Sequence, residues 1–195
     1  MARGSGEATD EVLMNRAQTG DVRAFAELVQ RYKDPMYNLA YRMLRDRQEA
    51  EDIAQETFLH VFRALNRFQT GERFSPWVYR IATNLCLDKL RRNKGMSISL
   101  DAPMGPESDV YLQVADPGDG PDAALELSEL RDDVQRAVDA LPERYRTIVI
   151  LRHLHDRSYE EIAEIVDLPL GTVKTRLFRA REILRRWLSG VVEPQ

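Results

Sequence analysis

Apolar residues along the chain recur at intervals of three and four positions, which is the period of an amphipathic helix. Asp21 is a typical N-cap residue and predicts a helix to about Tyr32, and Pro35 predicts the start of a second helix. Ser75 and Pro76 form an N-cap and first-turn pair that predicts another helix. The first half of the chain therefore predicts helices over about residues 21–32, 35–44, 48–65 and 75–94.

The same period returns in the second half, where it predicts helices over about residues 125–140 and 143–154. Ser158 and Glu161 have the spacing of a capping box, in which each side chain bonds the other residue's free backbone N–H. This box predicts a short helix, and residues 167–171 interrupt the pattern before a final helix through Trp187. Two helices around a short break, the second with a basic face, predict a helix-turn-helix.

Helical periodicity disappears in the middle of the chain, where Gly, Pro, Ser and Asp are frequent. No segment shows the alternation of a strand. The pattern predicts an all-α protein of two small helical domains joined by a flexible acidic linker. We expect a disordered N-terminus at 1–10, a first domain at 11–95, the linker at 96–124, a second domain at 125–189 and a C-terminal tail at 190–195.

Charge changes sign along the chain, although the 195 residues carry a formal net charge of only −4. Residues 74–95 have a net charge of +4, and residues 171–187 have +5. Residues 96–129 contain eight acidic side chains and no basic one. Two basic patches therefore flank an acidic segment, a layout that the net charge alone hides.

Composition and motifs argue against several classes of protein. The longest apolar run has four residues, and no secretory signal is evident, so we expect a soluble cytoplasmic protein without membrane insertion. The single cysteine, Cys86, and three histidines make a structural metal site improbable, and no cofactor is expected. No phosphate-binding loop, zinc-protease or serine-hydrolase motif occurs, so we expect no catalytic residues and no small-molecule substrate.

Three segments carry candidate binding chemistry. The final helix presents Thr and Arg side chains suited to a major groove, although a merely solvated basic helix is the alternative. In residues 74–95 aromatic and basic residues alternate, as in proteins that bind single-stranded nucleic acid, but such a stripe can equally belong to a core. The acidic face of residues 49–56 is, taken alone, most often a solvated surface.

Together these segments carry a more specific signal. The chain contains, in order, AEDIAQETFLHVFRAL, FSPWVYRIATNLCLDKLRR and SYEEIAEIVDLPLGTVKTRLFRAREIL. In this it resembles bacterial RNA polymerase sigma factors of the sigma-70 family, of the extracytoplasmic-function (ECF) type. The resemblance covers about residues 11–95 and 125–189, which would be sigma domains 2 and 4. It implies a subunit that binds core RNA polymerase and directs initiation at promoters with particular minus-10 and minus-35 elements.

The resemblance also implies roles for individual residues. The acidic face would bind core polymerase through Glu49, Asp52, Gln55 and Glu56. The minus-10 element would be bound, as single-stranded DNA, by Trp77, Tyr79, Arg80, Asn84, Asp88, Arg91 and Arg92. The minus-35 element would be bound by Thr172, Lys174, Thr175, Arg176, Phe178, Arg179 and Arg181.

Partners follow from the same resemblance: core RNA polymerase, promoter DNA and an anti-sigma factor. The competing hypothesis is an autonomous helix-turn-helix regulator whose N-terminal helices sense a ligand or dimerise. Such a regulator would bind duplex DNA tightly by itself, whereas a sigma factor would need core polymerase. A protein-interaction adaptor is a third and weaker hypothesis, because the last helix is rich in arginine.

Overall fold

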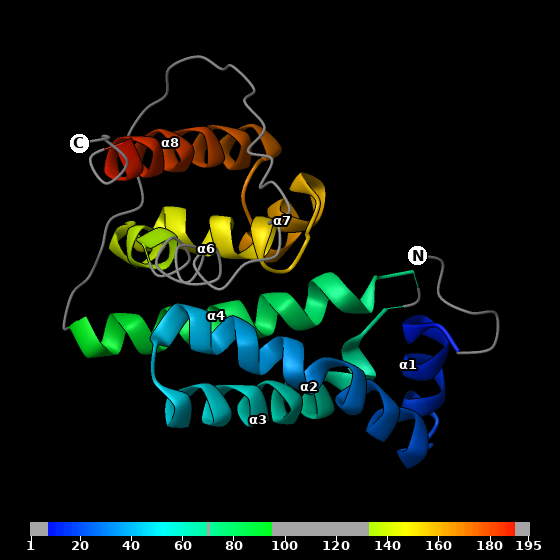
Figure 1. Cartoon of the computed structure of the whole chain (residues 1–195). Helices are drawn as coiled ribbons and strands as arrows, with labels where there is room; N and C mark the ends of the chain where they lie inside the picture. Colours follow the sequence, from blue (N-terminus) through cyan, green and yellow to red (C-terminus); the bar gives the residue numbers. More distant parts are fainter. Residues whose placement is uncertain (1–7, 70, 95–132, 190–195) are drawn as a thin grey trace, which may run out of the picture.

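The computed structural model describes residues 8–69, 71–94 and 133–189. Within these residues all regular structure is helical, which confirms the predicted all-α class. The helices form two units, one from residues 8–94 and one from residues 133–189 (Figure 1). The predicted linker at 96–124, residues 1–7 and the tail at 190–195 lie outside the described residues, as does the first part of the helix expected at 125–140.

The first unit contains four α-helices and one short 3₁₀ helix. Its long helices α2, α3 and α4 lie side by side, and α1 packs across one end of α2 (Figure 1). Thr9 caps α1, so ordered structure begins within the stretch expected to be disordered up to residue 10. The elements are α1 (Asp10–Gln18), α2 (Val22–Leu44), α3 (Arg47–Ala64), η1 (Leu65–Arg67) and α4 (Phe74–Lys94).

Helix α2 is continuous through Pro35, so the predicted division into two helices is wrong. A proline inside a helix removes one backbone hydrogen bond and costs about 3 kcal/mol. Leu28, Met36 and Leu39 lie on both sides of Pro35 and are fully buried. Each such side chain contributes about 1.5–3 kcal/mol on burial, so an unbroken apolar face outweighs the lost bond.

Helix α4 begins at Phe74, one residue before the expected N-cap, so Ser75 is not the cap of this helix. The Ser75 hydroxyl instead accepts a hydrogen bond of 2.8 Å from Arg157 Nη1 in the second unit. Ser75 therefore makes a contact between the two units and not the N-cap that the local sequence predicts.

The second unit consists of a helical segment at 133–140, α6 (Glu143–His153), α7 (Tyr159–Val166) and α8 (Leu170–Ser189). The predicted capping box is confirmed: Glu161 N donates to Ser158 Oγ over 3.1 Å, and Ser158 N donates to Glu161 Oε2 over 2.9 Å. Asp167 ends α7 in the left-handed conformation, with a φ of 51°. This sharp turn sets α8 across α7 and completes the helix-turn-helix.

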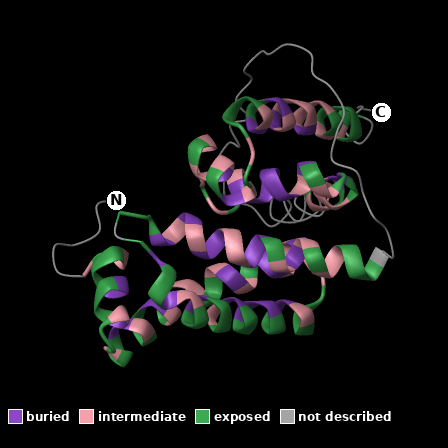
Figure 2. Cartoon of the chain, turned by 180° about the vertical axis from the view of Figure 1, so that it is seen from behind, coloured by how far each residue is buried: buried purple, intermediate pink, exposed green. Residues whose placement is uncertain are grey.

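The two units pack directly against each other, with α4 against α7 and α2 against α6 (Figure 1). Buried residues from both units form one continuous hydrophobic cluster, and they line the faces that the helices turn toward one another (Figure 2). None of the helices in the described part of the chain is long and apolar enough to cross a membrane.

Candidate functional site

The acidic face of α3 is positioned by the burial of the opposite side of that helix. Ala50, Ile53 and Thr57 are buried against α2 and α4, which leaves the intervening positions at the surface. Asp46 caps the helix, with its carboxylate 2.8 Å from Glu49 N. Of the four residues predicted to bind core polymerase, Asp52, Gln55 and Glu56 are exposed, and Glu49 is partly buried and paired with Lys89 Nζ at 3.3 Å.

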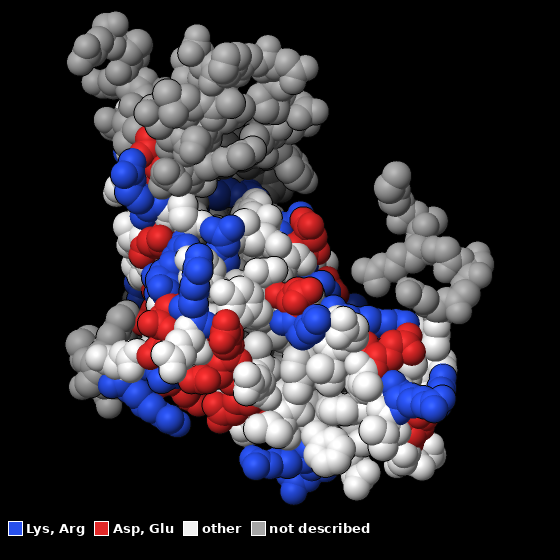
Figure 3. Space-filling view, turned by 60° about the horizontal axis from the view of Figure 1, so that its bottom comes forward, with Lys and Arg blue, Asp and Glu red and all other residues white. Residues whose placement is uncertain are grey.

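Exposed apolar residues adjoin this acidic face, and none of them is among the residues predicted to bind core polymerase. Leu59 is 55% exposed and follows Glu56 by three residues and Asp52 by seven, so all three lie on one face of α3. Phe62, 61% exposed, is a turn further on and meets the ring of Phe25 edge-to-face at 5.4 Å. Figure 3, which brings the α3 side forward, shows acidic side chains beside a broad uncharged area.

Helix α4 carries a polar stripe on its outer side. Asn84, Asp88 and Arg91 are exposed, Arg80 is partly exposed, and their spacing of three and four residues places them on one face. Asp88 and Arg91 are paired at 3.1 Å, so the guanidinium is held along the helix. Arg92 is exposed beside this stripe. The structure thus brings together Arg80, Asn84, Asp88, Arg91 and Arg92 of the predicted minus-10 set.

The two aromatic members of that set lie in different surroundings. Trp77 is half-buried on the same face as Arg80, with its ring 5.1 Å from the ring of Phe68 and 6.0 Å from that of Phe74. Tyr79 lies roughly 140° around the helix from Asn84 and is only 2% exposed. The structure therefore does not place Tyr79 with the other predicted minus-10 residues, because its ring packs against the second unit.

The helix-turn-helix presents the N-terminal half of α8. Val173, Leu177 and Ala180 are buried, whereas Lys174 is exposed. Thr175 is 6% exposed, so the expectation that it faces outward is wrong. Its hydroxyl donates back to the Gly171 carbonyl at 2.9 Å. The partly exposed predicted residues are Thr172, Arg176, Phe178, Arg179 and Arg181.

Basic side chains at this helix influence one another and a tyrosine of α6. Burial alone raises the pKa of Tyr145, but hydrogen bonds from Arg179 and Arg144 outweigh it and lower the pKa below its ordinary value. Burial, followed by the nearby charge of Arg144, lowers the pKa of Arg176. Arg144 also lies 4.9 Å from the centre of the Tyr145 ring. The basic surface of the second unit therefore includes α6 as well as the predicted recognition helix α8.

Comparison with known proteins identifies the family of this chain. The sigma-70 region 2 family model matches residues 28–95, and the sigma-70 region 4 model matches residues 131–184. The ECF RNA polymerase sigma factor SigW of Bacillus subtilis is 42% identical over 91% of this chain and 96% of its own length. The chain belongs to the ECF sigma factors of the sigma-70 family.

Further relatives agree with this assignment. The RNA polymerase sigma-H factor of Pseudomonas aeruginosa is 36% identical to this sigma factor over 94% of the chain and 95% of its own length. Among solved structures, CnrH in complex with the cytosolic domain of CnrY shares the fold, with a TM-score of 0.67 and 24% identity over 93% of this chain and 97% of that one.

The match covers both halves of the chain, and this disfavours the autonomous regulator. That hypothesis needs an N-terminal sensing or dimerisation domain, but α2 to α4 of this sigma factor correspond to region 2. The sigma factor directs promoter-specific transcription initiation and has core RNA polymerase and promoter DNA as its partners.

Two groups of residues were missed for different reasons. Leu59 and Phe62 carry no local sign of exposure, because apolar residues on a helix usually face inward, and only the fold shows that this side of α3 is open. Their spacing from Asp52 and Glu56 is the sequence signal that could have found them. Arg144 lies on α6, outside the predicted recognition helix, and no local motif marks it.

Proposed function

We propose that this sigma factor binds core RNA polymerase through the outer face of α3, formed by Asp52, Gln55, Glu56 and Leu59. The observation that carries this is the 55% exposure of Leu59 beside three polar residues. Phe62, three residues further along α3, is also exposed, and two adjoining apolar side chains beside polar ones match the apolar centre and polar rim of a protein interface. Glu49 would contribute at the edge, because Lys89 already neutralises part of its charge.

We propose further that the outer stripe of α4 binds the minus-10 element as single-stranded DNA. Arg80, Arg91 and Arg92 would contact phosphates, while Trp77 and Asn84 would meet bases by stacking and hydrogen bonding. Asp88 would keep Arg91 in place through their 3.1 Å ion pair. The shared exposed face of these residues supports this assignment.

For the minus-35 element, the proposed reading surface is the start of α8. Lys174, Arg176 and Arg181 would hold phosphates, and Arg179 and Phe178 would reach base edges in the major groove. Thr172 lies at the beginning of this helix, where a hydroxyl can bond a phosphate. Thr175 would act indirectly, by fixing the first turn of α8 through its bond to Gly171.

The remaining proposals concern the setting of the protein. This chain would act in the cytoplasm, where transcription takes place, and would perform no chemistry of its own, since RNA synthesis belongs to the core enzyme. An anti-sigma factor is the proposed regulator. A sigma factor of the same fold, RpoE of Bartonella quintana, has been solved in complex with the anti-sigma factor NepR, at 22% identity and a TM-score of 0.61 over 89% of this chain and 100% of that one.

Competition for purified core polymerase tests the polymerase-binding face. Asp52→Lys with Glu56→Lys should raise the dissociation constant for core polymerase at least about thirtyfold, because two neighbouring acidic side chains of the proposed contact would become basic. The matched control reverses two exposed acids elsewhere in the first unit, Glu11→Lys with Asp34→Lys. It makes the same change in net charge and should bind like the unaltered chain.

Equal affinity of both double variants would refute the proposed face. A circular-dichroism spectrum of each variant shows that helix content is retained. Leu59→Ser should weaken binding without any change in charge, which separates a specific contact from a general electrostatic effect.

A further inference from the structure

Tyr145, in the first turn of α6, lies between the core of the second unit and its basic surface. The residue is only 6% exposed and belongs to the hydrophobic cluster. Helix α6 packs against α8, which carries the proposed minus-35 residues (Figure 1). A tyrosine in this place combines a fixed apolar ring with a hydroxyl that needs a hydrogen-bonding partner.

The partners of the Tyr145 hydroxyl are two arginines. Arg179 of α8 and Arg144 of α6 each donate a hydrogen bond to it. The Arg144 guanidinium also lies 4.9 Å from the centre of the Tyr145 ring. One phenol oxygen therefore holds the ends of two cationic side chains that repel each other, and each comes from a different helix.

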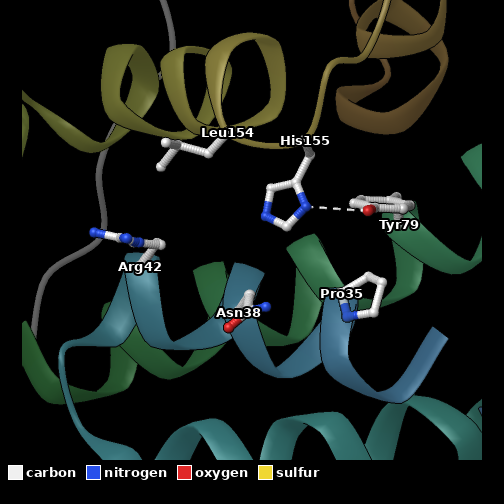
Figure 4. Close-up of a pocket in the computed structure, with 6 residues that line it drawn as sticks. All are labelled: Pro35, Asn38, Arg42, Tyr79, Leu154 and His155. Carbon is white, nitrogen blue, oxygen red and sulfur yellow. Dashed lines mark hydrogen bonds between the residues drawn. The ribbon is translucent and has the colours of Figure 1, made fainter. Parts of the chain in front are cut away.

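Two other tyrosine hydroxyls make contacts that only hold the fold together. The hydroxyl of Tyr79 is hydrogen-bonded to His155 Nδ1 at 3.1 Å, and this bond joins α4 to the second unit (Figure 4). The hydroxyl of Tyr32 donates to Asp10, which joins α2 to α1. Tyr145 differs from both, because its partner Arg179 is partly exposed in the N-terminal half of α8, among the residues proposed to contact the minus-35 element.

The shape of a guanidinium explains what this contact can do. Its N–H donors form a rigid planar fork with more than one edge. A donor of Arg179 that is bonded to Tyr145 leaves another edge with the parallel pair of N–H groups that a guanine accepts at O6 and N7. A long side chain that is already held also loses less conformational entropy when it binds DNA.

We propose that Tyr145 is a positioning residue for minus-35 recognition, which orients the Arg179 guanidinium toward its base while Arg144 holds the ring from α6. The role in recognition rests on the proposed base contact of Arg179, whereas the contact between Tyr145 and Arg179 in the free chain does not. Sequence preference at the minus-35 element thus depends on a hydroxyl that itself touches no DNA.

Transcription by the holoenzyme from a library randomised across the minus-35 element tests this role. Tyr145→Phe keeps the ring and removes only the acceptor of the Arg179 bond. It should reduce the preference for the best base about threefold to tenfold, at the same positions that Arg179→Ala affects. In a chain that already carries Arg179→Ala, the same change should reduce the preference no further.

The matched control is a second tyrosine that contacts an arginine of α8. Tyr159→Phe removes a hydroxyl that accepts from Arg181 Nη2 at 3.4 Å. Because Arg181 is proposed to hold a phosphate, this variant should weaken all promoters alike and leave the preference unchanged. An unaltered preference with Tyr145→Phe, an equal loss in both tyrosine variants, or a loss that persists beside Arg179→Ala would each overturn the positioning role.

Nuclear magnetic resonance of the free full-length chain tests the contact without DNA. The Nε–H signal of Arg179, assigned by its absence from Arg179→Lys, should show a smaller heteronuclear Overhauser effect in Tyr145→Phe, because the guanidinium gains rapid motion. The signal of Arg181 should not change. An Arg179 side chain that is equally rigid with and without the Tyr145 hydroxyl would overturn the proposal.

Failure of the proposed function gives a different result. If Arg179→Ala leaves the minus-35 preference unchanged, the base contact of Arg179 is refuted, and positioning for recognition is refuted with it. The resonance measurement would then show whether the bond between Tyr145 and Arg179 exists as a packing contact alone.

Discussion

Asn84 and Tyr79 lie five residues apart on α4 and meet opposite surroundings, and this decides what each can do. Asn84 is exposed on the outer stripe, whereas Tyr79 is covered by His155 and Arg157. The same helix therefore reads DNA with one side in our account and holds the second unit with the other.

A substitution of Asn84 should accordingly impair minus-10 binding. Asn84→Ala in the holoenzyme should weaken binding to a promoter with a pre-melted minus-10 region about tenfold, because a base loses a hydrogen-bonding partner. Fluorescence anisotropy with the labelled promoter measures this. Asn66→Ala, at an exposed asparagine of η1, is the control and should bind normally. Identical affinity of the two variants would remove Asn84 from the minus-10 surface.

Two basic residues of α8 should respond differently to truncation. Arg179→Ala should relax the sequence preference at one or two minus-35 positions, because a guanidinium that bridges one guanine contributes about 1–3 kcal/mol of discrimination. Lys174→Ala should weaken binding to all promoters alike and should reduce the slope of log affinity against log salt concentration by about 1. Transcription from a library randomised across the minus-35 element distinguishes them. An unchanged preference with Arg179→Ala would leave that residue a structural role beside Tyr145.

At the scale of single elements, local signals predicted the structure well and tertiary contacts limited the rest. The Ser158 capping box was predictable because both partners lie within one turn. The helix start predicted at Pro35 is wrong, because the free-energy cost of a proline inside a helix is offset by burial of apolar residues along the whole of α2. The role of Tyr79 could not be predicted from α4 alone, because His155 and Arg157, which cover its ring, lie 76 and 78 positions further along the chain.

The capping box should also be measurable as stability. Ser158→Ala removes the hydroxyl that accepts from Glu161 N, and the loss of such a cap costs about 0.5–2 kcal/mol. Chemical denaturation followed by circular dichroism should show this decrease. Ser189→Ala, at the C-terminal end of α8, should change stability little, because its hydroxyl only bonds the Arg186 carbonyl at the surface. Equal stability of both variants would mean that the α7 terminus does not depend on its cap.

For the whole molecule, acid should favour opening of the two units. Burial, and then the charge of Arg157, lowers the pKa of His155 from 6.5 to about 4 in the closed state, while Asp156 opposes this and Arg42 adds to it. The hydroxyl of Tyr79 is its uncharged neighbour from α4. An opened His155 would regain its ordinary pKa and bind more protons. Closure is therefore fully favoured above about pH 6.5 and is progressively lost between 6.5 and 4.

Single-molecule energy transfer between dyes attached at Gln30→Cys on α2 and Arg186→Cys on α8, two exposed positions, measures this pH dependence. The ratio of open to closed molecules should rise on acidification by at most about tenfold for each pH unit. His155→Gln should flatten the response, although His153, whose pKa is also lowered mainly by burial, still titrates in that variant. A response that is the same with and without His155 would assign the effect to other groups.

Transcription with purified components tests the central claim most directly. Core RNA polymerase alone, the chain alone and the two together are incubated with fragmented genomic DNA, and the 5′ ends of the transcripts are mapped. The account predicts defined start sites only with both components, preceded by shared minus-35 and minus-10 sequences, and their loss with Asp52→Lys and Glu56→Lys. Tight binding of the chain alone to a duplex operator, with no new start sites when core polymerase is present, would contradict it.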